Sequence, residues 1–397
     1  MSSGLSLMPD DVLILIAAAL VDVKDLLSFR LACKSLYHKT KQHFSHRCLA
    51  TIDTDLSRQH LRRLTHLAAD KELAPGVRAL RINHTPAILG QGFVWERHPD
   101  GYLANPASNE AGEVLAALLT TDLINCRSFH VEGRRADEDD YELDDITPTD
   151  AINFLLAIIA KTRIRPKAFS IELRKNGTGR MDGKRLNLQQ QQQYQTPAFT
   201  QAWAKLETLR LELTLSRASF NNVLQLVTTA TNLKVLWLNL DFCMCDEFVS
   251  SVIAAEGALQ CLQEIHFKDL FVSEELLQGL LAACSSSRLG LRALTIQFVT
   301  LREGGSWQGI FNHLRSHAPR LGRIDLCYLK ALVGGKLQGV VFHDFEEHFG
   351  RRNISPTSLE VVRKKRSGDD RIHGFSYHGS LGLNLLEAVI ASAVTLR

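Results

Sequence analysis

A short apolar pattern recurs along most of the chain and constrains the fold more than any other sequence feature. The pattern is apolar-x-x-apolar-x-apolar, as in Leu233-Leu236-Leu238. Its middle apolar positions are Leu80, Phe129, Phe169, Leu209, Leu236, Ile265, Leu294 and Ile324. The last four intervals are 27, 29, 29 and 30 residues, a length typical of one strand and one helix per repeat. Because a single such unit cannot bury its own apolar face, the pattern predicts stacked repeats with a continuous core.

Amphipathic segments occupy the intervals between these predicted strands. They are Glu110–Thr121, Ala151–Lys161, Phe220–Thr229, Phe248–Ala255, Glu274–Ala283 and Trp307–His317. A strand, a turn and a helix at this pitch resemble leucine-rich repeats, which implies an α/β solenoid with a curved parallel sheet inside and helices outside. The repeats are irregular, since Asn239 is the one residue near the position where such repeats usually carry an asparagine.

We assign residues 50–329 to this solenoid, and its first three intervals contain loop insertions near residues 84–109, 133–149 and 175–198. Within them lie the glycine- and proline-rich Gly90–Asn109, the acidic Asp137–Asp145 and the glutamine run Gln189–Gln193. After Leu329 the rhythm stops. We predict that residues 330–397 form a C-terminal cap or tail, with a capping helix over Leu383–Val394.

Side chains alternate along a strand, so the leucines of each repeat should face the helices and the x positions the concave surface. In neighbouring parallel strands the middle x positions should form one column, Arg210, Trp237, His266, Thr295 and Asp325. We expect a target protein to bind this face through Arg210, Glu212, Trp237, His266, Lys268, Arg323 and Asp325. Tryptophan and arginine are enriched at the energetic centres of interfaces. The alternative is that Trp237 is buried under a loop or the tail and only packs.

Residues 5–49 contain three short helical patterns in a segment too small to form a stable core alone. Pro9 with Asp10 and Asp11 is typical of a helix start. Val12, Ile16 and Leu20 then recur every four residues, which predicts one apolar stripe. Such a unit should dock its remaining apolar surface on another protein.

This segment resembles an F-box. The resemblance rests on Met8-Pro9-Asp10-Asp11-Val12-Leu13, Ile16, Leu20, Asp25-Leu26-Leu27, Arg30-Leu31, Cys33-Lys34 and Tyr37. It departs from the usual pattern at Met8, at Ala32 and in a longer spacer between Leu20 and Asp25. The alternative is an ordinary helical cap on a larger domain.

The resemblance implies that residues 1–49 dock on the Skp adaptor of a cullin–RING ubiquitin ligase. The implied adaptor contacts are Met8, Pro9, Ile16, Leu20, Leu26, Leu27, Arg30, Leu31, Lys34 and Tyr37. The remainder of the chain would recruit an unknown protein substrate. We therefore expect a non-catalytic substrate-recognition subunit of an SCF-type ligase. The alternatives are an F-box/leucine-rich-repeat scaffold acting outside a ligase and an enzyme whose site no motif reveals.

Composition agrees with a folded protein that has no extended nucleic-acid surface. Of the 397 residues 45% are apolar and 22% charged, and the formal net charge is only +3. No stretch approaches the roughly 20 apolar residues that a membrane span needs. Without a secretion signal, the eight cysteines are expected to be reduced thiols in a cytoplasmic or nuclear protein.

Motifs for catalysis or cofactor binding are not found in the sequence. There is no G-x-S-x-G, P-loop or H-E-x-x-H pattern, so we expect no catalytic residue and no cofactor. Cys243, Cys245 and Cys261 lack a second close pair of ligands, and His313 with His317 lacks a third, so we expect no metal site. The basic tetrad at 363–366 is a solvated surface, or alternatively a nuclear import signal or an anion patch.

Overall fold

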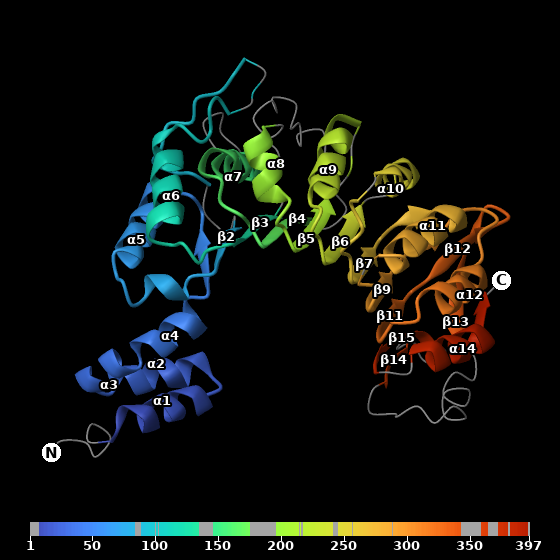
Figure 1. Cartoon of the computed structure of the whole chain (residues 1–397), viewed down its shortest axis with the longest axis horizontal. Coiled ribbons are helices and arrows are strands. Elements are labelled where there is room, and N and C mark those ends of the chain that lie inside the picture. Colours follow the sequence, from blue (N-terminus) through green and yellow to red (C-terminus); the bar gives the residue numbers. More distant parts are fainter. Residues whose placement is uncertain are drawn as a thin grey trace. The chain divides into compact units, whose positions relative to one another are not determined.

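The protein is described here from a computed structural model, in which the chain is mixed α/β (Figure 1). The described residues are 8–83, 89–99, 101, 103–134, 146–174, 196–213, 215, 217–240, 245–255, 257–287, 289–342, 359–363, 372–379 and 382–395. The chain divides into two compact units. Unit 1 comprises Met1–Ala168 with Gln193–Ala202, and unit 2 comprises Phe169–Gln192 with Trp203–Arg397.

Unit 1 begins with four short helices, one more than the sequence pattern predicts. They are α1 (Asp10–Ala19), α2 (Val23–Leu31), α3 (Lys34–Lys39) and α4 (Lys41–Cys48). The expected stripe of Val12, Ile16 and Leu20 is not the face that packs inside the segment: Leu13 and Ala17 are fully buried, whereas Val12 is 39% exposed. The reason is that α1 is apolar almost all round, so the spacing of its apolar residues does not identify the face that packs.

The helical segment is fastened to the rest of unit 1 through α4. The Ser45 hydroxyl donates a hydrogen bond to the backbone oxygen of Leu73, at 2.6 Å. That carbonyl precedes a single helical turn, η2 (Ala74–Gly76). A Cβ added to Gly76 would lie 2.6 Å from the backbone of Ser45, so only glycine allows α4 to come this close.

The rest of unit 1 alternates parallel strands with helices. The strands are β1 (Thr51–Thr54), β2 (Ala79–Asn83) and β3 (Ser128–Arg134). The helices are α5 (Arg58–Ala68), α6 (Glu110–Thr121), α7 (Pro148–Thr162) and α8 (Pro197–Trp203), the last ending at the unit boundary. Helix α7 opens with a capping box, in which Thr147 and Asp150 satisfy each other's backbone N–H groups.

The glycine- and proline-rich segment between β2 and α6 is packed rather than simply exposed. Leu89, Trp95 and Leu103 in its described part are buried. The Trp95 indole donates to the backbone oxygen of Gly90 at 2.9 Å, and its ring packs edge-on against Phe154 of α7. This insertion therefore adds a small core of its own. The acidic Asp137–Asp145 and the glutamine run Gln189–Gln193 lie outside the described residues.

Unit 2 contains most of the strands. They are β4 (Ala168–Arg174, with Ala168 in unit 1), β5 (Thr208–Leu213), β6 (Val235–Leu240), β7 (Glu264–Lys268), β8 (Phe271–Val272), β9 (Ala293–Gln297), β10 (Thr300–Leu301), β11 (Arg323–Cys327), β12 (Lys330–Val333), β13 (Lys336–Phe342), β14 (Leu359–Arg363), β15 (Ile372–His378) and β16 (Ala393–Thr395). Their order is β4-β5-β6-β7-β9-β11-β15, and β5, β6, β7, β9 and β11 run parallel.

Helices α9 (Arg217–Thr229), α10 (Cys245–Ala254), α11 (Glu274–Ser285) and α12 (Trp307–His317) follow the strands in turn and lie along one side of the sheet (Figure 1). The six helices predicted from the sequence are confirmed, to within three residues at each end. In β6, Leu236, Leu238 and Leu240 are buried while Val235, Trp237 and Asn239 are partly exposed, which confirms the predicted alternation.

A left-handed residue follows each of the strands β7, β9 and β11. These residues are Asp269, Phe298 and Tyr328, with φ of 52°, 55° and 51°. The N–H of Asp269 donates to the carbonyl of Gln297, and that of Phe298 to the carbonyl of Cys327, at 3.0 and 2.9 Å. The turn redirects the chain into β8, β10 and β12, which pair in parallel.

The C-terminal segment is more than the expected cap, because it extends the sheet. Strand β15 pairs antiparallel with β11, β14 pairs with β15, and β16 pairs with β13. The predicted capping helix is α14 (Gly382–Ser392), which packs on α12. A Cβ on Gly374 of β15 would lie 2.4 Å from the backbone oxygen of Leu326, so glycine permits this close strand approach.

Candidate functional site

The predicted column of side chains is present in unit 2. The strand pairing places Arg210 opposite Trp237, Trp237 opposite His266, His266 opposite Thr295, and Thr295 opposite Asp325. Neighbouring parallel strands lie about 4.8 Å apart, so these side chains form a continuous row across five strands. We refer to Arg210, Trp237, His266, Thr295 and Asp325 as the central row.

Three members of the central row form a stack. The Arg210 guanidinium carbon lies 4.6 Å from the centroid of the Trp237 ring. On the other side, the rings of Trp237 and His266 are 4.4 Å apart and inclined by only 16°. A cation over an indole face is attracted by the negative charge density of the ring. Trp237, which is partly exposed, is therefore held between two planar groups.

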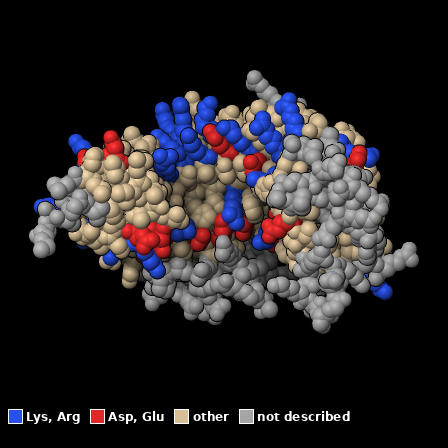
Figure 2. Space-filling model, turned by 90° about the horizontal axis from the view of Figure 1, so that it is seen from below, with Lys and Arg blue, Asp and Glu red and all other residues tan. Residues whose placement is uncertain are grey.

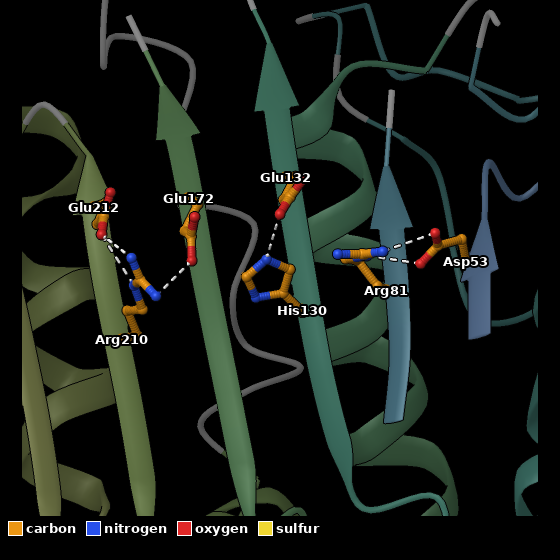
Figure 3. Close-up of polar contacts among 7 residues, drawn as sticks. All are labelled: Asp53, Arg81, His130, Glu132, Glu172, Arg210 and Glu212. Atoms are coloured by element: carbon orange, nitrogen blue, oxygen red, sulfur yellow. Dashed lines mark hydrogen bonds and ion pairs between the residues drawn. The ribbon is translucent and has the colours of Figure 1, made fainter. Parts of the chain in front are cut away.

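Two buried carboxylates fix the arginine. Glu172 of β4 and Glu212 of β5 are 2% and 8% exposed, and both form ion pairs with Arg210. The Arg210–Glu172 contact is 3.0 Å long, and Figure 3 shows the guanidinium turned towards both acids. Glu212, expected to bind a target directly, is thus a support for Arg210. Glu172 was missed, although it follows Ile171 just as Glu212 follows Leu211 in the repeated pattern.

His266 is buried and electrically neutral near pH 7. Burial, with a smaller contribution from Arg323, lowers the pKa of His266 to about 4. The imidazole is 8% exposed. Among the described residues, neither its Nδ1 nor the Trp237 Nε1 has a hydrogen-bond partner. His266 therefore contributes an aromatic face to the stack rather than a charge.

The far end of the row is polar. Arg323 forms an ion pair with Glu264 at 2.6 Å, and Gln297 donates to the Asp325 carboxylate at 3.0 Å. Burial raises the pKa of Asp325. Lys268, the remaining expected target contact, is partly exposed at the end of β7. The row thus offers an arginine and an aromatic pair at one end and a hydrogen-bonded acid at the other.

Charges of both signs lie close together on the face seen in Figure 2. Ion pairs within unit 1 contribute to this pattern. Arg81 makes two contacts with Asp53, at 2.6 and 2.8 Å, and His130 lies 3.1 Å from Glu132 (Figure 3). These pairs bring opposite charges together on neighbouring or alternate strand positions of unit 1.

The residues expected to contact an adaptor fall into two groups. Met8, Pro9, Leu27, Leu31, Lys34 and Tyr37 are exposed, and Ile16 and Leu20 are partly so. Leu26 and Arg30 are buried, which corrects the expected docking face. The Arg30 guanidinium carbon lies 4.1 Å from the Phe44 ring and 4.6 Å from the Tyr37 ring, so this residue packs inside the helical segment.

The cysteines and histidines considered for metal binding in the sequence contact a backbone carbonyl or each other. Cys245 is buried with its sulfur 3.4 Å from the Leu240 carbonyl oxygen, and Cys243 lies outside the described residues. The His313 and His317 rings stack with centroids 4.2 Å apart. Burial and the neighbouring His317 lower the pKa of His313. Of the basic tetrad, only Arg363, at the end of β14, is described.

A comparison with models of known protein families gave no match. A comparison with curated proteins gave none either. Among the described residues, no helix has the length and apolar character needed to cross a membrane.

Proposed function

We propose that the chain is a non-catalytic substrate-recognition subunit of an SCF-type ubiquitin ligase, with an F-box at residues 1–49 followed by a leucine-rich-repeat-like solenoid. The observation that carries the proposal is the apolar surface of the N-terminal helices. Nine of the fourteen exposed large apolar side chains among the described residues belong to this segment: Met8, Val12, Ile14, Leu15, Val21, Val23, Leu27, Leu31 and Tyr37. Such a concentration is typical of a protein-binding surface.

The proposed docking contacts are those side chains that the helical segment leaves uncovered. Leu31 and Leu15 are 78% and 69% exposed, and Leu27 is 39% exposed. Burying them against a Skp-type adaptor would remove apolar area from water, at roughly 25 cal/mol per Å². Leu26 and Arg30 would act indirectly, by keeping the helices packed.

In this function the chain contributes proximity. A target held near the ubiquitin-conjugating enzyme experiences a raised effective concentration, which requires no nucleophile or base from the receptor. We propose the central row as the target surface. Arg210 and Trp237 supply the kind of residues that dominate interface energetics, and the two buried acids pre-organise the arginine.

The adaptor interaction is tested with the full-length chain and a purified Skp-type adaptor by titration calorimetry. Leu27→Asp with Leu31→Asp would place two charges in an apolar contact and should abolish measurable binding. The matched control is Val333→Asp with Leu337→Asp, two exposed apolar residues of unit 2, which should bind like the wild type. Wild-type protein that fails to bind the adaptor, or a control pair that loses binding equally, would contradict the F-box proposal.

Cullin recruitment separates the ligase from a scaffold. A complex that contains the adaptor and the cullin supports the ligase role, whereas adaptor capture without the cullin favours the scaffold.

For the target surface, Trp237→Ala with Arg210→Glu should lose the substrate identified by affinity purification while retaining the adaptor. Unchanged substrate binding in this folded double variant would exclude the central row.

A further inference from the structure

Unit 1 contains an open pocket that the proposed function does not use. Its volume is about 1050 Å³, and it lies where β1 and β2 end and α5 begins. The lining residues are Asp53, Thr54, Asp55, Ser57, Arg58, Gln59, His60, Arg62, Arg63, His66, Asn83, Gln91 and Gly92. The lining contains no leucine, isoleucine, valine, phenylalanine, tyrosine or tryptophan, whereas pockets for drug-like ligands are predominantly apolar.

The two acidic groups of the pocket have partners within the protein. Asp53 forms its two contacts with Arg81, which balances its charge. Asp55 accepts a hydrogen bond from the backbone N–H of Ser57 at 2.8 Å, and its own backbone N–H donates to His60 Nδ1 at 3.1 Å. Asp53 is therefore balanced by an arginine, whereas Asp55 is held by hydrogen bonds and keeps its negative charge.

One of the three arginines is also occupied. Arg58 donates to the Gly92 carbonyl at 2.8 Å, contacts Glu110 at 2.6 Å and lies over the Phe93 ring. Arg58 therefore shapes the pocket wall and contributes little net charge to its interior.

Arg62 and Arg63 differ from Arg58. Both are exposed, and among the described residues neither has a hydrogen bond or an ion pair. Both lie on α5. Because the other face of this helix is buried through Leu61, Leu64 and Ala68, the two arginines stay on its solvent-exposed side. Arg62 and Arg63 are consecutive on the helix, so their side chains point in different directions, and each guanidinium presents five N–H donors in the fork geometry that suits a carboxylate.

From this arrangement we propose that the pocket binds an acidic peptide segment, with adjacent carboxylates meeting Arg62 and Arg63. His66 lies one turn further along α5, and Gln59 and Gln91 supply hydrogen-bonding groups for a peptide backbone. A single small anion would leave most of the volume empty, whereas a run of acidic side chains fills it and satisfies both arginines. This site is independent of the F-box assignment and of the central row.

The test uses the full-length chain and fluorescein-labelled hexaglutamate, with binding followed by fluorescence anisotropy at low and moderate salt. Wild-type protein should bind hexaglutamate, with affinity falling as salt rises, and should not bind hexaserine. Arg62→Gln with Arg63→Gln should weaken binding by about tenfold or more, since two charge-assisted contacts are lost. Circular dichroism should show an unchanged fold, because both side chains are exposed.

The matched control is Lys71→Gln with Arg78→Gln, which removes two exposed positive charges of unit 1 outside the pocket lining. It should bind hexaglutamate within about twofold of the wild type, because the screened long-range attraction changes little. Equal weakening in both double variants would show general charge attraction and overturn the proposal. So would absence of hexaglutamate binding, or binding of a phosphoserine peptide alone, which would indicate a phosphoryl site. A benzophenone-labelled hexaglutamate should crosslink within residues 53–66, at Asn83 or within 91–92, and crosslinks elsewhere would also overturn it.

Discussion

The imidazole of His266 lies parallel to the indole of Trp237, with ring centroids 4.4 Å apart. Burial, with smaller contributions from Arg323 and Arg210, lowers the pKa of His266 to about 4 and so keeps the stacked imidazole uncharged. His266, which we expected to contact a target directly, is therefore a buried aromatic member of the central row.

The first prediction concerns the pH dependence of stability. The pKa of His266 is about 4 in the folded chain, below the ordinary value of 6.5. The unfolded chain therefore binds more protons between these two values, so stability rises with pH across this window and is lost as pH falls through it. The contribution is at most about 3 kcal/mol. Asp325 changes stability in the opposite direction. Its pKa is raised in the folded chain, so the free energy of unfolding falls as pH rises through the acid range.

Urea unfolding of wild type and His266→Phe at pH 4.5 and 7.0 isolates the histidine contribution. Phenylalanine preserves an aromatic stack on Trp237 but cannot titrate. The variant should show a smaller gain in unfolding free energy between the two pH values than the wild type. An identical gain in both proteins would mean that His266 is not neutral and buried.

The second prediction tests the apolar side of the strands. Leu236 and Leu294 are completely buried, so replacing either by alanine should cost roughly 2–5 kcal/mol of unfolding free energy. Leu337→Ala makes the same chemical change at a residue that is 62% exposed and should cost less than about 0.5 kcal/mol. Chemical denaturation measures all three. A Leu236→Ala protein as stable as Leu337→Ala would refute the strand pattern drawn from the sequence.

A third prediction concerns the close approach of β15 to β11. Alanine at Gly374 would bring a Cβ within 2.7 Å of the Cys327 Cα as well as near the Leu326 oxygen, so the strands must separate. We expect a loss of about 1–3 kcal/mol, the usual cost of overpacking. Gly339→Ala on β13 is the control, because its Cβ would meet nothing within 4 Å. Thermal melts should therefore show a lower midpoint for Gly374→Ala alone.

A fourth prediction separates packing from docking in the N-terminal helices. Leu26 is fully buried, so Leu26→Ala should loosen these helices and expose them to limited proteolysis. Leu31→Asp changes a side chain that is 78% exposed and should leave protease resistance unaltered. If the two variants are cleaved at the same rate, the inward and outward faces of α2 are not as described.

The sequence predicted the parallel repeats well because their information is local. The strands are defined by the spacing of five apolar residues, Leu209, Leu236, Ile265, Leu294 and Ile324. The residue after each of them belongs to the central row, in the observed pairing. The F-box resemblance, by contrast, remains a prediction that neither the fold nor the comparisons test.

What the sequence did not reveal depends on contacts between distant segments. The role of Glu172 follows from its ion pair with Arg210, which lies on the next strand. The turns at Asp269, Phe298 and Tyr328 have no glycine at the left-handed position, so the sequence did not lead us to expect a left-handed backbone there. The antiparallel pairing of β15 joins residues about 50 positions apart, beyond the reach of any periodic pattern.

That antiparallel strand also sets the timing of folding during synthesis. Strands β5, β6, β7, β9 and β11 can pair as each emerges from the ribosome, because each of them adds beside the one named before it. The outer edge of β11 stays open until Ile372–His378 has been made. We therefore expect the synthesis of β15 to decide when unit 2 ceases to expose this edge, on which nascent chains can aggregate.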